Sequence, residues 1–438
     1  MTRLLTGCLA AALIGAPPAS AQTSPADVRE ALHLADLQRE ARGADPRMRE
    51  IDLLTQQTDL RLRNIDMEGR PSFSVLGQSQ YTSDAPSSPF NGPDGLPLFG
   101  APKFTYDGSL RVDQRLYDAS LQPRRDLTRA DLAESQARVR TALFALRQEV
   151  NDAFFAAAVL QEQLGALTAT LDDLDARLSE TTKRVKEGAA LPGEAAAIEA
   201  TLLQQRQQAD ALRANRAAAL ARLSVLTGRT IDAAAVMALT DSAESVAHIR
   251  EAVLHERARP EYEQFDRARK RATRQQEMAT VADRPQASVF GRAGYGRPGL
   301  NVISDQPEAY ALAGVQFQWK AWAWGTSGRE RDVLAIQQTI VSAEEAAFTS
   351  GLRRAIEVDL AAIGHLEASL PTDDRIVALR ESIDRTARVR LDAGVITASE
   401  YLDRHTEWLT AQFDRARHRV ELAQARANVQ MKLGVEVQ

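Results

Sequence analysis

The sequence predicts a mainly α-helical protein with a small β part, written as two tandem copies of one helix–strand–strand–helix unit. Three observations support this. The chain is rich in Ala, Leu, Arg, Glu and Gln and has few helix breakers, as long helices require. A set of landmark residues occurs twice at one spacing. Two pairs of segments alternate apolar and polar residues with period two, which is typical of strands with one wet face.

The duplication is visible in single residues and in a longer segment. Segment 70–81 recurs as segment 284–295, and a repeat of roughly 210 residues far exceeds the ~20–50 residues of a solenoid unit. The recurring landmarks are Arg184, Gly188, Glu194 and Gly228, repeated as Arg390, Gly394, Glu400 and Gly434. The predicted divisions are 1–21, a signal peptide; 22–228, a first repeat with strands at about 71–117 and a tip at about 188; and 229–438, a second repeat with strands at about 285–323 and a tip at about 394.

The first residues have the three regions of a secretory signal. Arg3 gives the positive region, Leu4 to Ala16 the apolar region, and Ala19-Ser-Ala21 the cleavage site. A competing interpretation is lipidation of Cys8, because Leu5-Thr-Gly-Cys8 matches a lipoprotein box, although too few apolar residues precede it. Cys8 is the only cysteine, so a mature chain cleaved after Ala21 would have no disulfide, thiolate metal site or cysteine nucleophile.

Charge and hydropathy argue against a nucleic-acid-binding protein and against a protein with transmembrane helices. Removing residues 1–21 removes one base and no acid, which takes the net charge from −5 to −6, and this mild acidity argues against nucleic acid as a partner. No later window of about 18 residues is free of charge, so no transmembrane helix is expected. An exported chain can still enter a membrane as β-strands.

Each copy is expected to contain one very long helix and one returning helix. Leucines and other apolar residues from Val139 to Leu178 recur at steps of three and four, the 3.5-residue period of coiled coils. The spacing predicts a helix over about 120–187, on the order of 100 Å long, ended by Gly188 in an αL cap. Pro192 suits the start of a return to about 227. The second copy repeats this with a helix from about 326, a stop at Gly394 and a return to 433.

One breaker falls inside each long helix. Gly165 and Pro371 occupy equivalent positions, and each disfavours a straight helix, Pro371 more strongly. The sequence therefore predicts a kink or a short loop at Pro371.

The strand pairs are two-faced. In segment 104–113 one face is apolar, formed by Phe104, Tyr106, Leu110 and Val112. The other face is polar, formed by Thr105, Asp107, Ser109, Arg111 and Asp113. The expected partner of this segment is segment 72–81. The second copy supplies segments 286–295 and 310–323. Each segment is about ten residues long, as a tilted transmembrane strand requires.

Trp319, Trp322 and Trp324 cluster where the last strand is expected to leave a bilayer, the depth of aromatic girdles. They equally suit a plug of ordinary core between strands and helices. Four strands cannot close a barrel, and open edges are not tolerated in lipid. Three chains would supply twelve strands, so the sequence predicts a homotrimer.

These features together resemble the TolC-like outer-membrane efflux family. The resemblance covers essentially the whole mature chain and rests on the paired tips, Arg184 to Gly188 and Arg390 to Gly394, each followed six residues later by an acid. It rests also on Arg259-Pro-Glu261 before the second strand pair and on the strand-exit segments 114–118 and 319–325.

The resemblance implies a trimeric channel with a 12-stranded barrel in the outer membrane and a helical tunnel across the periplasm. It implies that a periplasmic adaptor protein and an inner-membrane transporter dock at tips marked by Arg184, Gly188, Arg390 and Gly394. It also implies acids at the periplasmic aperture, here Glu194, Glu400 and Asp403. The last two are three residues apart, hence on one helix face.

The chain departs from the family pattern in two places. The aromatic and basic residues that latch some members shut are absent at Leu391 and Ile396, and the acid at the end of the second strand pair is Ala323, whereas the first copy keeps Asp118. The resemblance therefore predicts the fold but not the latch.

No enzyme, cofactor or metal is expected. Gly294-Tyr-Gly296-Arg-Pro-Gly299 matches a dinucleotide motif in letters, but Pro298 denies the helix that such a motif requires. The first functional hypothesis is a passive outer-membrane duct for efflux or type I secretion. The alternative is a periplasmic coiled-coil scaffold that never enters a bilayer, and a third is an adaptor protein, which would carry one hairpin rather than two duplicated units.

Overall fold

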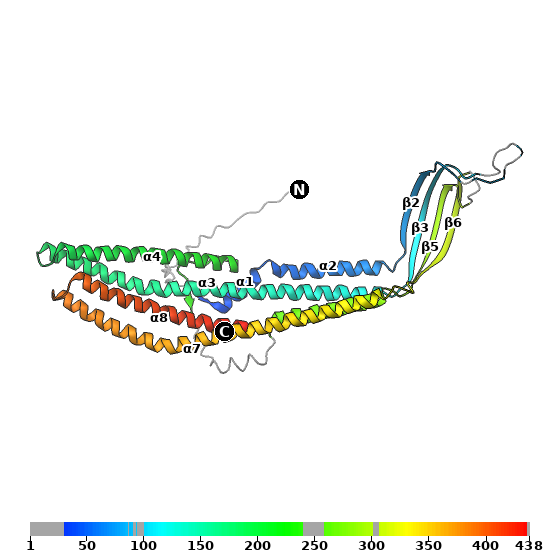
Figure 1. Cartoon of the computed structure of the whole chain (residues 1–438). Coiled ribbons are helices and arrows are strands. Elements are labelled where there is room, and N and C mark those ends of the chain that lie inside the picture. Colours follow the sequence, from blue (N-terminus) through cyan, green and yellow to red (C-terminus); the bar gives the residue numbers. More distant parts are fainter. Residues whose placement is uncertain are drawn as a thin grey trace, which may run out of the picture.

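The computed structural model describes residues 30–85, 87–90, 93, 100–239, 258–300 and 306–435. The predicted signal peptide, its cleavage site and Cys8 lie outside these residues. The chain is strongly elongated: a small sheet stands at one end, and two helical hairpins reach away from it to the other end (Figure 1).

The two copies have the same order of elements. The first copy consists of β1 (Ala31–His33), α1 (Leu34–Ala44), α2 (Arg47–Met67), β2 (Ser72–Tyr81), β3 (Phe104–Asp118), α3 (Leu121–Lys186) and α4 (Pro192–Thr227). The second consists of β4 (Val236–Ala238), α6 (Pro260–Val281), β5 (Gln286–Arg297), β6 (Glu308–Gln318), α7 (Thr326–Asp392) and α8 (Ala398–Leu433). Apart from the short β1, α1 and β4, the helix–strand–strand–helix–helix order is identical, and the mainly helical fold class is confirmed.

The long helices have nearly equal lengths. Helix α3 has 66 residues and α7 has 67, so each spans about 100 Å. The short loop that was one of the two expectations at Pro371 is not present, because α7 is one continuous helix, which curves along its length (Figure 1). Contacts to α8 hold the helix on both sides of the proline: Leu366 belongs to a buried cluster with Leu422, and His418 Nδ1 lies 2.7 Å from Asp373 Oδ2. Helix α3 also continues through Gly165.

The sheet is antiparallel, with strand order β2-β3-β5-β6. The two hairpins meet at β3 and β5, where Leu110 pairs with Ala293 and Arg111 with Arg292. Strand β3 continues five residues beyond the two-faced segment 104–113, close to the expected end at about 117, because its ladder continues to the start of β5, where Asp118 pairs with Gln286. Strands β2 and β6 form the two edges, each with one partner among the described residues.

The last strand is shorter than expected. It ends at Gln318, so Trp319, Trp322 and Ala323 lie in the connection to α7 and not in the strand. The ladder ends there because Gln318 pairs with Gln286, the first residue of β5, and no strand residue remains to pair with Trp319. Trp324 and Gly325 then adopt left-handed backbone conformations, with φ of 52° and 70°, and turn the chain into α7.

The corners from strand to helix differ between the copies. In the first copy, the Asp118 carboxylate accepts hydrogen bonds from the Ser120 amide at 2.9 Å and the Ser120 hydroxyl at 2.7 Å. In the second copy, Ala323 offers only its backbone carbonyl, which accepts from the Thr326 amide at 2.9 Å. The missing acid is thus replaced by a different turn.

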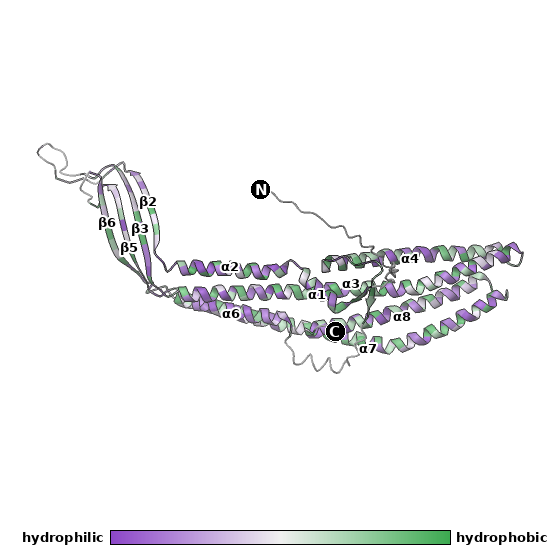
Figure 2. Ribbon diagram, turned by 180° about the vertical axis from the view of Figure 1, so that it is seen from behind, coloured by the Kyte–Doolittle hydropathy of each residue, from purple (hydrophilic) through white to green (hydrophobic). Residues whose placement is uncertain are grey.

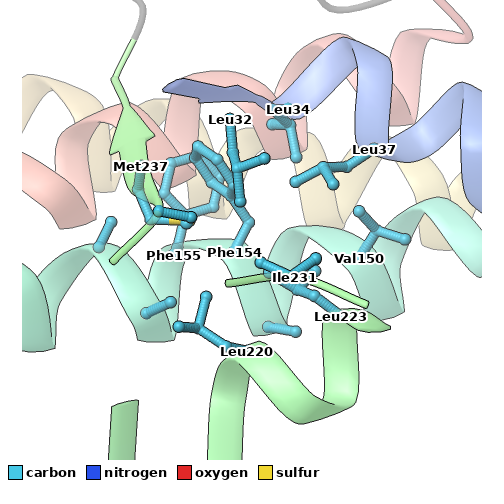
Figure 3. Close-up of a cluster of buried hydrophobic side chains, with 14 of the residues drawn as sticks. Leu32, Leu34, Leu37, Val150, Phe154, Phe155, Leu220, Leu223, Ile231 and Met237 are labelled. Carbon is cyan, nitrogen blue, oxygen red and sulfur yellow. The ribbon is translucent and has the colours of Figure 1, made fainter. Parts of the chain in front are cut away.

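The largest core lies halfway along the molecule. Leucines of β1 and α1 meet Phe154 and Phe155 of α3 and Leu220 and Leu223 of α4, and Met237 of β4 closes the cluster (Figure 3). The two phenylalanine rings pack edge to face with centroids 5.2 Å apart. This core ties the first hairpin to the short elements and, through Val420 and Ala427, to α8.

Hydrophilic and hydrophobic residues alternate along the full length of the helices (Figure 2). Within the described residues, α3 is long and apolar enough by length and composition to cross a membrane, although no transmembrane helix was expected from the sequence. That expectation required a window free of charge, whereas the sparsely charged middle of α3 suffices by composition. Residues of α3 such as Val150 and Phe154 pack into the protein core, and 33% of the apolar stretch is buried within the single chain.

Candidate functional site

The two hairpin turns form the end of the molecule farthest from the sheet. Gly188 and Gly394 have φ of 75° and 70°, the left-handed conformation that ends a helix, as the sequence predicts. The bonding is the same in both turns. The Arg184 carbonyl accepts from the Ala189 amide at 2.7 Å, and the Arg390 carbonyl accepts from the Val395 amide at 2.8 Å. The duplicated Arg-x-x-x-Gly motif therefore produces two equivalent tips.

The three predicted aperture acids lie just past these tips. Glu194 is in the first turn of α4 and half-buried, whereas Glu400 and Asp403 are exposed in the first turns of α8. Glu400 has a local task that sequence reasoning missed. Its carboxylate accepts from the Thr397 amide at 3.0 Å, while the Thr397 hydroxyl accepts from the Glu400 amide at 3.2 Å. This capping box fixes the start of α8 and was readable as Thr397-x-x-Glu400.

A buried polar network above the tips joins three helices and was not predicted. The Tyr401 hydroxyl of α8 donates to Asp173 Oδ2 of α3 at 3.0 Å, and His405 Nδ1 lies 2.9 Å from Asp384 Oδ1 of α7. Arg388 Nη2 of α7 lies 2.9 Å from the same Asp173 oxygen. Tyr401 is fully buried, and His405 is 1% exposed. The network therefore fastens the second hairpin to α3.

Acids and bases are paired in this network, and Arg177 also lies 3.2 Å from Asp392. Asp173 and Asp384 face the guanidinium groups of Arg177 and Arg388, and Arg177 stacks on the Tyr401 ring at 5.0 Å. Burial, then the negative charge of Asp173, raises the pKa of the Tyr401 hydroxyl above its ordinary value of 10.0. The hydroxyl is thus held protonated as a donor.

The positions where the family latch is absent belong to an apolar core beside this network. Leu391 is 7% exposed and packs with Leu174, Ile198 and Leu202, and Ile396 lies against the same cluster. At these two positions the chain packs apolar side chains, in place of the aromatic and basic latch residues that the resemblance would imply.

The apolar face of the sheet is exposed. Phe73, Val75 and Leu110 alternate with polar residues and expose 72%, 83% and 50% of their surface. The same face continues across the sheet through Phe104, Tyr295, Val315 and Phe317, all exposed. A row of large apolar side chains without protein cover is a site for lipid or for another protein.

The opposite face of the sheet is polar. Arg292 donates to Asp107 and, at 2.8 Å, to the Ser109 hydroxyl, and the Tyr310 hydroxyl also donates to Asp107. Arg111 forms a bidentate pair with Asp113, with both contacts at 2.8 Å. The predicted partition, with Leu110 on one face and Asp107 and Arg111 on the other, is present in the structure.

The tryptophan cluster lies where the sheet joins the helices. Trp319, Trp322 and Trp324 are 59%, 75% and 79% exposed, and the last two rings meet edge to face at 5.8 Å. They do not plug the junction within the chain, because their surfaces are open. In the described part of the chain there is no group of three or more His, Cys, Asp or Glu residues able to hold a metal ion.

Residues 70–229 match the family described as outer membrane efflux protein. A comparison with curated proteins gives no significant match. Among solved structures, the fold is similar to the CmeC outer membrane channel of Campylobacter jejuni, with TM-score 0.65, 15% identity and coverage of 92% of this chain and 85% of that one. It is similar also to the outer membrane protein VceC of Vibrio cholerae, with TM-score 0.65, 15% identity and coverage of 92% of this chain and 97% of that one. A third similar structure is the open state of the MtrE channel of Neisseria gonorrhoeae, with TM-score 0.63, 16% identity and coverage of 92% of this chain and 89% of that one.

The matched segment covers the first strand pair, its long helix and its return, and the structural likeness extends over both copies. The first copy therefore matches the outer membrane efflux protein family, and the chain as a whole has the fold of the TolC-like outer-membrane channels.

Proposed function

We propose that three copies of this chain form a passive duct through the outer membrane, serving a tripartite efflux pump or a type I secretion system. The observation that carries the proposal is the four-stranded sheet with an exposed apolar face and two free edges. A free edge in lipid leaves backbone donors and acceptors unpaired, at a cost of several kcal/mol each. Pairing the β2 edge of one copy with the β6 edge of the next removes all such edges in a closed ring of twelve strands.

The strand lengths support a membrane location for this ring. Strands β2, β3, β5 and β6 have 10, 15, 12 and 11 residues, so each is long enough for a tilted transmembrane strand, which needs about 9–11. The exposed apolar side chains would face lipid, and the Asp107 and Arg111 face would line the lumen. Trp319, Trp322 and Trp324 would then lie at the membrane–water interface on the helical side.

The helical part would form the periplasmic tunnel. Helices about 100 Å long lead from the sheet to the two tips, and the first residues of the chain have the pattern of an export signal. The periplasmic adaptor and the inner-membrane transporter would dock at the tips around Gly188 and Gly394. In a trimer, Glu400 and Asp403 would place six carboxylates around the aperture, with Glu194 beside them, and attract cations. No enzymatic role is proposed.

The alternative, a periplasmic scaffold, leaves the sheet unexplained. A scaffold gains nothing from a face on which Val75 and Val315 are more than two-thirds exposed, and such a face in water promotes aggregation. The helices alone fit either function, so the sheet decides between them.

Cell fractionation tests the proposal. The protein is expected in the outer-membrane fraction, to need detergent for extraction, and to form conducting pores in planar lipid bilayers. Recovery in the soluble periplasmic fraction, without detergent and without pore formation, would contradict the duct and favour the scaffold.

A further inference from the structure

The polar face of the sheet carries a ladder of paired charges, which we define as Asp107, Arg111, Asp113 and Arg292. Each base has an acid partner within the same chain: Arg292 pairs with Asp107, and Arg111 pairs with Asp113. The side chains of all four are between 24% and 36% exposed, so they lie open at the surface of this face. The remaining charged residues of the four strands, Arg115, Asp118, Arg297 and Glu308, lie near strand ends.

The ladder is fixed in place by two aromatic rings. The Arg111 guanidinium lies 5.2 Å from the centroid of the Phe290 ring, and the Arg292 guanidinium lies 5.6 Å from that of Tyr310. Tyr310 also donates its hydroxyl to Asp107. Each base is thus held between an aromatic face and a carboxylate, a geometry that guanidinium groups favour.

Glycines on the neighbouring strands leave room for these two aromatic rings to lie against the sheet. A Cβ added at Gly294 would lie 2.7 Å from Cζ of Tyr310, and one added at Gly314 would lie 2.9 Å from Cζ of Phe290. The rings therefore lie across bare backbone, which leaves the charged groups as the outermost layer of the polar face.

We propose that this ladder determines the ion preference of the barrel lumen. Because its charges are paired, the lumen prefers neither anions nor cations. The proposal rests on the proposed function, in which this face lines the pore. Each copy contributes two acids and two bases in contact, so the fields of opposite charges cancel at the distance of a passing ion. In a narrow lumen with low-dielectric walls, the electric field of an unpaired charge would be focused into the pore and would act strongly on passing ions. The duct would then pass anionic and cationic cargo alike at this level, and charge selection would be left to the acids at the helical mouth.

The test separates the two members of one pair. Asp107→Asn leaves Arg292 without its counter-charge and adds three positive charges per trimer, whereas Arg292→Gln does the opposite. A change in local potential of about one kT alters the local concentration of monovalent ions roughly threefold. Because anions are enriched about threefold and cations depleted about threefold by the same potential, their ratio changes by the product of the two factors. In planar bilayers with a salt gradient near ~0.1 M, the anion-to-cation permeability ratio is therefore expected to rise about sevenfold in Asp107→Asn and to fall about sevenfold in Arg292→Gln. The double variant is expected to return close to the parent.

The controls distinguish the inference from the function on which it rests. Trimer content and unit conductance are measured for each variant, and Arg111→Gln with Asp113→Asn serves as a second pair if the first fails to assemble. Conducting trimers whose permeability ratios all equal that of the parent would overturn the inference while leaving the duct intact. A parent protein that inserts but does not conduct would overturn the proposed function, and the inference with it.

Discussion

Replacing Leu110 by arginine tests which face of the sheet meets lipid. Leu110 lies in the middle of β3, six residues from Phe104 and eight from Asp118, and pairs with Val75 on one side and Ala293 on the other. Its side chain is half exposed on the apolar face. In the proposed barrel the new guanidinium would enter the hydrocarbon region with no polar partner on that face.

The expected loss follows from the depth of this position. Six residues at about 3.4 Å each, along a strand tilted by roughly 40°, place Leu110 about 15 Å below the outer end of β3, half the thickness of a hydrocarbon core of about 30 Å. Arginine at the midplane of a barrel costs about 2–4 kcal/mol per chain. Equilibrium unfolding in urea, with the protein in lipid vesicles, measures this loss as a lower transition midpoint.

The matched control is Gln78→Arg on the neighbouring strand. Gln78 pairs with Asp107, is exposed and lies on the polar face, so an arginine there is expected to change stability by less than about 1 kcal/mol. Ser109, next to Leu110 in sequence, is a poorer control, because it is 5% exposed and accepts a hydrogen bond from Arg292. Equal destabilisation by Leu110→Arg and Gln78→Arg would refute the assignment of the two faces.

Three further predictions concern the helical end. Neutralising the aperture with Glu400→Gln and Asp403→Asn is expected to lower cation selectivity and to weaken block by multivalent cations. Both effects are expected to be smaller at 1 M salt, where the Debye length is about 3 Å. Glutamine keeps the capping box, so unchanged selectivity at low salt with intact trimers would exclude these acids from the ion path. Tyr401→Phe is expected to cost about 1–2 kcal/mol through the lost bond to Asp173. Because the folded pKa of Tyr401 is raised, its contribution is complete below the unfolded value of 10.0 and is lost as pH rises above it; thermal unfolding between about pH 8 and 11 is therefore expected to show a weaker alkaline loss in the variant, and identical losses would contradict this. Gly394→Ala forces alanine into a φ of 70° and is expected to cost about 1–2 kcal/mol in urea unfolding, whereas Gly364→Ala inside α7, with open space around it, is expected to be neutral or stabilising; similar losses at both would contradict the tip geometry.

The ends of the helices follow from local chemistry, and local chemistry is visible in the sequence. Helix α4 begins at Pro192 and is followed by Gly228 in the left-handed conformation, as the helix-start proline and helix-end glycine predict. The two-faced strands were equally predictable, because period-two alternation is set by strand geometry alone.

The errors have non-local causes. The end of β6 depends on where its partner β5 begins, which cannot be read from the residues of β6. The helix at Pro371 is retained by contacts to α8 nearly fifty residues away, such as that between Asp373 and His418. A propensity for a break is weaker than tertiary packing on both sides of it.

The buried network at Tyr401 had no sequence signal at all. Its central bond joins Tyr401 to Asp173 across 228 residues, and each residue alone suits an ordinary helix surface. The capping box at Glu400 is the reverse case, because its signature was local and readable but was interpreted only as an aperture acid.

The most direct test of the central claim is the mass of the detergent-extracted protein before and after heating, measured by native mass spectrometry together with circular dichroism. If the free edges of β2 and β6 close a ring of three chains, the particle has three times the mass of the mature chain, and heat converts it to monomers with loss of β signal. A stable monomer that stays soluble without detergent and keeps its sheet would contradict the account, because a chain with both strand edges free cannot lie in a bilayer.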